Sequence, residues 1–126
     1  MDRKFQVYRK INRQNKLTTW WRYLEDGDIR MSSKEPFNRY GAMRAVRGLI
    51  DQCKRCDKFG YAVKIKKGRD KYYRWSWHMK GRLVASCSDP FHTAEDAFND
   101  STDVLHRIRG HQATIVSPTG TVFKEK

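Results

Sequence analysis

The chain repeats itself, and this internal repeat constrains the fold more than any other feature of the sequence. Residues 5–50 and 61–105 read as two copies of one unit, related by a shift of 54 positions. A repeat of this length is one supersecondary unit that buries its apolar side against its neighbour. The matched pairs are aromatic, turn and proline residues: Trp21/Trp75, Gly27/Gly81, Ser32/Ser86, Pro36/Pro90 and Phe37/Phe91.

At the start of each copy the shift becomes 56, which pairs Phe5 with Tyr61 and Val7 with Val63. We interpret the difference as about two extra loop residues in the first copy. A lone unit of this size buries little core, so we expect the two copies to pack on each other.

Each copy predicts three strands followed by a helix. Alternating and β-branched or aromatic residues mark the strands, and apolar residues at helical spacing mark the helices. A capping box at Thr93–Asp96 predicts the start of the second helix, which we expect to stop near Gly110. The predicted elements are 4–10, 19–24, 29–32 and a helix in 40–53, then 61–66, 71–79, 82–87 and a helix in 93–110.

These elements predict an α+β fold in which two tandem β-β-β-α repeats pack as one body, with antiparallel sheet or sheets and two helices. The first repeat is expected at 1–58, the second at 59–110, and a C-terminal extension at 111–126. Within this extension, the runs 114–116 and 121–123 flank a Pro-Thr-Gly turn, which predicts a last β-hairpin or an added strand pair that covers a sheet edge.

The second copy resembles the YegP-like tandem-repeat family, whose members are largely of unknown function. The matching segments are Tyr73-Arg74-Trp75, Lys80-Gly81, 83–86 and the helix from Thr93; the first copy matches less closely and departs at Arg30-Met31. The resemblance implies a ββα-type fold with strands paired or swapped between copies, and it transfers no catalytic residue. A shorter segment, 91–97, is similar to the start of the helix in the ethylene-response-type DNA-binding domain.

Charge is the second informative feature. The chain has 27 basic and 14 acidic residues, a net charge of +13, and the excess is spread over both repeats. A fold-wide excess of this size indicates a polyanionic partner, either nucleic acid or an acidic protein surface, although solvated surface charge alone also produces it. Because no apolar run is long enough to span a membrane and no signal peptide is evident, we expect a cytoplasmic protein with reduced cysteines.

The candidate binding residues are cations and aromatics on the sheet face turned away from the helices, joined by the basic first helix. Lysine and arginine neutralise phosphate, and exposed rings stack on bases. An ordinary solvated face has the same composition. In the first copy these residues are Tyr8, Trp20, Arg22 and Arg30 on the sheet and Arg39, Arg44 and Arg47 on the helix; in the second copy they are Lys64, Lys66, Tyr72, Arg74, His78 and Arg82.

No motif indicates a reaction or a cofactor. Cys53 and Cys56 form a CxxC, but no second pair of ligands stands at a zinc-finger spacing, and a buried helix position explains Cys53 equally well. The four histidines lie in different elements, and no phosphate-binding glycine loop is present. We therefore expect no metal, no cofactor and no enzymatic activity.

These observations predict a small non-catalytic nucleic-acid-binding protein, monomeric or homodimeric. The alternative, from another class, is a phage-type anti-defence inhibitor that binds an acidic surface of a host protein or nucleoprotein complex.

Overall fold

The computed structural model describes residues 2–33, 37, 41–54, 61–110, 114–116 and 122–124. In this part of the chain two three-strand-and-helix units follow one another, which confirms the predicted α+β class. The elements are β1 (Arg3–Ile11), β2 (Leu17–Glu25), β3 (Asp28–Ser32), α1 (Gly41–Lys54), β4 (Ala62–Lys67), β5 (Tyr73–Met79), β6 (Arg82–Cys87), α2 (Ala94–Gly110), β7 (Thr114–Val116) and β8 (Val122–Lys124).

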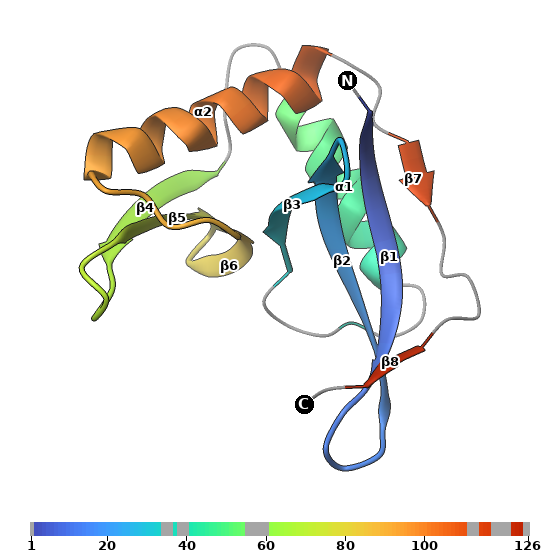
Figure 1. Cartoon of the computed structure of the whole chain (residues 1–126). Coiled ribbons are helices and arrows are strands. Elements are labelled where there is room, and N and C mark those ends of the chain that lie inside the picture. The colour runs from blue at the N-terminus through green and yellow to red at the C-terminus, as the bar shows by residue number, and fades with distance from the viewer. Residues whose placement is uncertain are drawn as a thin grey trace.

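The strands of the described residues form one eight-stranded sheet (Figure 1). Its order is β4-β5-β6-β3-β2-β1-β7, with β8 also paired to β1. The two copies meet where β3 and β6 pair antiparallel, and this contact is short: Met31 lies opposite Cys87, and Ser32 opposite Ser86. The two serines are equivalent in the two copies, so an approximate twofold axis passes between them.

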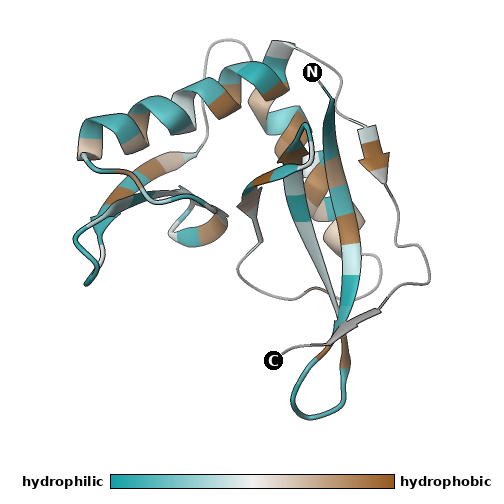
Figure 2. Ribbon diagram, viewed as in Figure 1, coloured by the Kyte–Doolittle hydropathy of each residue, from teal (hydrophilic) through white to brown (hydrophobic). Residues whose placement is uncertain are grey.

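Both helices cover the same face of the sheet. Apolar residues alternate with polar ones along β1, as Figure 2 shows, and the apolar ones point toward the helices. One continuous core contains side chains from both copies, so the repeats fold as one body. Its largest buried members are Trp21, Tyr23, Phe5, Trp75 and Trp77.

The predicted capping box starts α2. The Asp96 N–H donates to the Thr93 hydroxyl oxygen at 3.0 Å, which satisfies one of the free N–H groups of the first turn. The helix ends at Gly110, as expected.

The β1–β2 and β4–β5 turns are built alike, so the prediction of extra loop residues in the first copy is wrong. The Asn12 N–H donates to the Lys16 carbonyl at 2.9 Å, and the Gly68 N–H donates to the Tyr72 carbonyl at 2.8 Å. The extra residues lie in the strands instead. β1 and β2 have 9 residues each, whereas β4 has 6 and β5 has 7.

The longer first hairpin changes which residues are equivalent. Val7 lies opposite Trp21, and Ile65 lies opposite Trp75. Since the two tryptophans are equivalent, Val7 corresponds to Ile65 rather than to Val63 as the sequence suggested. The sequence alignment was therefore wrong by two residues on this strand.

Each copy has a β-bulge at the same place. The pairing register shifts between Tyr23 and Leu24 in the first copy and between Trp77 and His78 in the second. A bulge leaves an extra residue unpaired and turns the side chains that follow it toward the opposite face. Side-chain directions on β3 and β6 therefore cannot be read from simple alternation.

The tail strands do not form the predicted hairpin. β7 pairs parallel with β1 at residues 4–6, and β8 pairs parallel with β1 at residues 9–11. Both strands thus extend along one edge of the sheet, which matches the expected covering of an edge. A hairpin would have required the two strands to run antiparallel to each other.

Candidate functional site

The sheet face turned away from the helices is crossed by one row of polar residues. Each is the direct cross-strand partner of the next, so the row crosses six strands without a break. Neighbouring strands lie about 4.8 Å apart, so the row is roughly 24 Å long. From β4 to β1 its members are Lys64, Ser76, Ser86, Ser32, Arg22 and Gln6.

Most of the predicted binding residues lie on this same surface, which we call the outer face and define by the outward residues of β1, β2, β4 and β5 with Ser32 and Ser86. None of these residues is Asp or Glu within the described strands. A row of cations and hydroxyl groups without carboxylates on the strands attracts anions. The predicted members found here are Tyr8, Trp20, Arg22, Lys64, Lys66, Arg74 and His78.

In the first copy, cations lie over two half-buried rings of the outer face. The Arg22 guanidinium is 4.7 Å from the centre of the Tyr8 ring, and the Lys10 ammonium is 4.4 Å from the Trp20 ring. The Arg22 Nε also donates to the Gln6 side-chain oxygen at 2.6 Å. The contact with a ring holds each cation at a fixed place on the face. Because one side of each ring is covered by a cation, stacking of a base on these rings contributes less than the sequence suggested.

In the second copy the outer face is hollowed. A depression of about 770 Å³ is lined by residues of β4, β5 and β6. Lys64 and Lys66 are exposed at its side. The depression is also lined by Ile65, Ser76, His78, Leu83 and Ser86.

Within this depression the Ser76 hydroxyl and the His78 Nε2 are 2.8 Å apart. The sequence analysis did not pair them, although residues two apart on a strand share a face. Burial and then the nearby Lys64 lower the His78 pKa, which favours the neutral imidazole. Among the described residues nothing hydrogen-bonds to its Nδ1. A nucleophile–base pair has a third group that orients the base, and the described residues do not supply one.

Arg74 and Tyr72 have local partners. Arg74 forms a two-pronged ion pair with Asp70, with N–O distances of 3.1 and 2.7 Å. Arg74 holds the Asp70 pKa down, at about 2. Tyr72 lies in the turn before β5, where its ring contacts His92 at 5.2 Å.

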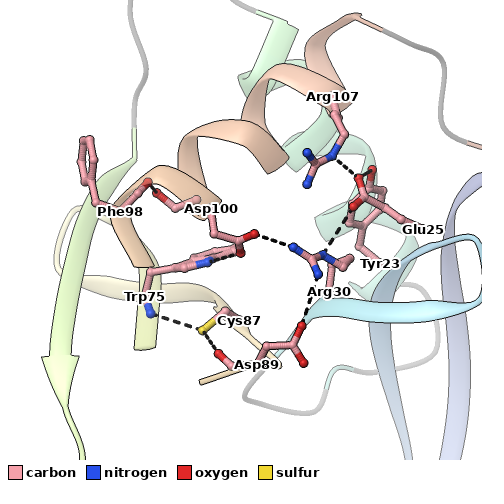
Figure 3. A network of polar contacts seen from close by, with 10 residues as sticks. Tyr23, Glu25, Arg30, Trp75, Cys87, Asp89, Phe98, Asp100 and Arg107 are labelled. Atoms are coloured by element: carbon pink, nitrogen blue, oxygen red, sulfur yellow. Dashed lines mark hydrogen bonds and ion pairs between the residues drawn. The ribbon is translucent and has the colours of Figure 1, made fainter. Parts of the chain in front are cut away.

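Arg30 does not lie on the outer face, contrary to prediction. The bulge in the β2–β3 pair turns its side chain toward α2, where it contacts the carboxylates of Asp89, Asp100 and Glu25 (Figure 3). Arg30 therefore joins the first copy to the second.

Arg30 and three further charged residues fill the space between β2–β3 and α2. We call this cluster of Glu25, Arg30, Asp100 and Arg107 the filled junction. The Arg107 Nε donates to Glu25 at 2.5 Å, and the Trp75 indole N–H donates to Asp100 at 2.8 Å (Figure 3). The Glu25 carboxylate also accepts from the Tyr23 hydroxyl at 2.9 Å and is only 7% exposed.

Arg82 also lies off the outer face, for the same reason. The register shift in the β5–β6 pair places it opposite Met79, beside a second cavity on the helix side. The predicted helix residues Arg44 and Arg47 are exposed on α1, in the layer opposite the outer face. Arg39 lies outside the described residues. The two predicted basic surfaces are therefore separate.

No group of three metal-ligating side chains comes together in the described part of the chain. Cys53 is completely buried, as its helix position predicted, and burial raises its pKa to about 12. Its partner in the CxxC, Cys56, lies outside the described residues.

Comparison with known proteins supports the fold and does not extend to a function. No protein-family model matches the chain, and no curated protein does. A solution structure of Escherichia coli YegP, described as a protein of unknown function, superposes with a TM-score of 0.63 at 15% identity, covering 96% of this chain and 97% of that one. The chain shares the fold of YegP.

A UPF0339 protein from Shewanella oneidensis has the same fold, with a TM-score of 0.60, 10% identity and coverage of 98% of this chain and 92% of that one. These structures support the YegP-like resemblance at the level of fold. The similarity to the ethylene-response-type domain stays a prediction. None of the described helices is long and apolar enough to cross a membrane.

Proposed function

We propose that the protein binds single-stranded nucleic acid through the outer face and catalyses no reaction. The observation that carries the proposal is the continuous row from Lys64 to Gln6 on a face where the outward residues of β1, β2, β4 and β5 include no carboxylate. The row of about 24 Å accommodates a run of several nucleotides. The fold and the sequence resemblance further support a distant membership of the YegP-like family.

A single strand fits this face better than a duplex does. The major groove is about 12 Å wide and admits a two-stranded ribbon, whereas the row crosses six strands. A flexible strand can lie along the row with its phosphates near Lys64, Lys66 and Arg22. The binding is then dominated by phosphate contacts and has little base preference.

The test is fluorescence anisotropy of a labelled oligo-dT of about 20 nucleotides, titrated at several salt concentrations. The three cations neutralise about three phosphates, which gives a slope of log affinity against log salt near −2. The double variant Lys64→Ala/Lys66→Ala is expected to reduce the steepness by about 1.4. The matched control Arg44→Ala/Arg47→Ala removes the same charge from α1 and is expected to leave the slope unchanged.

Each other outcome is informative. An equal decrease of the salt slope in both double variants would show that net charge alone drives binding. A loss only in the α1 variant would move the site to that helix. No binding of single strand or duplex at about 50 mM salt overturns the proposal and favours the second candidate, an inhibitor that docks on an acidic protein surface.

A further inference from the structure

The approximate twofold axis makes the two contacts between the repeats equivalent, but their side chains differ. Buried positions of the helices correspond at a shift of 55: Ala42/Ala97, Val46/Ser101, Leu49/Val104 and Cys53/Ile108. Strand positions after the hairpins correspond at 54. The filled junction therefore has a counterpart formed by Met79, Val84, Ala45 and Gln52, which we call the open junction.

The open junction contains a cavity of about 420 Å³. All four of its residues line this cavity, in places where the filled junction has Glu25, Arg30, Asp100 and Arg107. Three of the replacements are apolar, and Ala45 is much smaller than the aspartate it matches. The ionic groups that close one junction are thus absent at the other, and space remains between α1 and the β5–β6 hairpin.

The cavity is lined mainly by apolar side chains, and three of them belong to the buried core. Trp21 and Leu49 are each 1% exposed, and Tyr61 is 7% exposed. Gly48 lies on the cavity wall, and a Cβ atom added there would meet nothing within 4 Å. Small-molecule sites in proteins have similar volumes and a similar apolar lining.

The polar groups of the cavity favour a negatively charged ligand. The charged residues among the described lining are both basic, Lys80 and Arg82, and both are exposed at the turn that forms the mouth. Trp21 lines the cavity. At the filled junction the equivalent indole, that of Trp75, donates to a carboxylate.

We propose that the open junction binds a small amphipathic carboxylate, with its alkyl or aromatic body in the cavity and its carboxylate facing donors of Trp21, Lys80 and Arg82. This site lies on the helix side of the sheet, away from the outer face.

The first experiment uses isothermal titration calorimetry with sodium decanoate below its micelle concentration, and with decanol as the neutral analogue. Decanoate is expected to bind with one-to-one stoichiometry and more tightly than decanol. Lys80→Asn/Arg82→Gln is expected to weaken decanoate about tenfold, the size of one charge-assisted hydrogen bond, and to leave decanol unchanged. Asparagine at position 80 keeps the turn, because Asn-Gly is favoured there.

The second experiment fills the cavity. Gly48→Leu places a side chain in the open space on α1 and is expected to abolish decanoate binding while keeping or raising the melting temperature. The control is Asp103→Leu, which introduces the same side chain at the equivalent position of α2. This variant is expected to bind decanoate as the wild-type protein does. Absence of binding to the wild-type protein at millimolar decanoate, or unchanged binding by a folded Gly48→Leu protein, overturns the proposal.

Discussion

Replacing Arg30 by valine, the residue at the equivalent place in the second copy, tests how the filled junction holds the repeats together. The guanidinium contacts three carboxylates whose side chains are 8%, 13% and 54% exposed, those of Glu25, Asp100 and Asp89. Breaking a buried ion pair by removing one partner costs about 3–5 kcal/mol. The contact with the exposed Asp89 contributes less than about 1 kcal/mol.

Two structural facts reduce the full cost. Glu25 keeps its contacts with Arg107 and Tyr23, and Asp100 keeps the Trp75 indole N–H. We therefore expect Arg30→Val to lower the free energy of unfolding by about 2–3 kcal/mol. For a chain of this length the melting temperature falls by roughly 10 °C.

Urea unfolding followed by far-ultraviolet circular dichroism measures the effect, with an unchanged m-value as the sign that the unfolded state is unaffected. Arg47→Val on the exposed side of α1 is the control and is expected to change stability by less than about 0.5 kcal/mol. If Arg30→Val is no more destabilising than this control, the ionic cluster does not hold the repeats together and the reasoning is refuted.

The fourfold variant Glu25→Met, Arg30→Val, Asp100→Ala and Arg107→Gln converts the filled junction into the side chains of the open one. It leaves no buried charge without a partner. Its loss of stability is therefore expected to be smaller than the sum of the four single losses, since residues in one network are not additive. Additive losses would contradict the network shown in Figure 3.

Three further predictions rest on single residues. Cys53 is expected to resist iodoacetamide at pH 8 until the protein unfolds, because burial raises its pKa to about 12; peptide mass spectrometry identifies the alkylated site. The His78 pKa is lowered by burial, so protonation favours the unfolded state, and stability is expected to fall as the pH drops below about 6.5; His78→Gln removes this part of the pH dependence in urea titrations. Gly81 has φ of +79°, so Gly81→Ala is expected to lose about 1–2 kcal/mol in thermal unfolding, whereas Gly48→Ala in α1 gains about 0.5–1 kcal/mol.

The repeat made much of the fold predictable, because turns and cores are local. The shift of 54 relates the turns at Gly27 and Gly81 and also the two bulges. Hairpin length was not predictable in the same way. Adding two residues to each arm of a hairpin keeps the inward and outward pattern of each strand, so the sequence cannot show where the two extra cross-strand pairs lie.

Side-chain direction near the bulges was the main error in the candidate site. The sequence analysis placed Arg30 and Arg82 by the alternation of an ideal strand. No residue type nearby indicates the register shift that turns them to the other face. The tail is a similar case. The run Thr114–Val116 is β-prone whether it forms a hairpin or joins the edge of a sheet, and only the position of β1 decides between them.

On the row across the outer face, the residues that the sequence analysis missed are neutral ones. Ser32, Ser76 and Ser86 complete the row across the outer face, but a search for cations and rings passes over serine. The match of Ser32 with Ser86 in the repeat was the available signal. It marked the centre of the sheet, where the two copies pair.

The approximate twofold axis between Ser32 and Ser86 has a consequence for how such a molecule can diverge. A single β-β-β-α unit joined to an identical copy across this axis would be a symmetric dimer, and its two junctions would necessarily have the same side chains. Both junctions would be filled by charged side chains, or both would contain a cavity. In a single chain that contains both copies, the two junctions can have different side chains. One junction can therefore hold the repeats together through ion pairs while the other keeps an internal cavity.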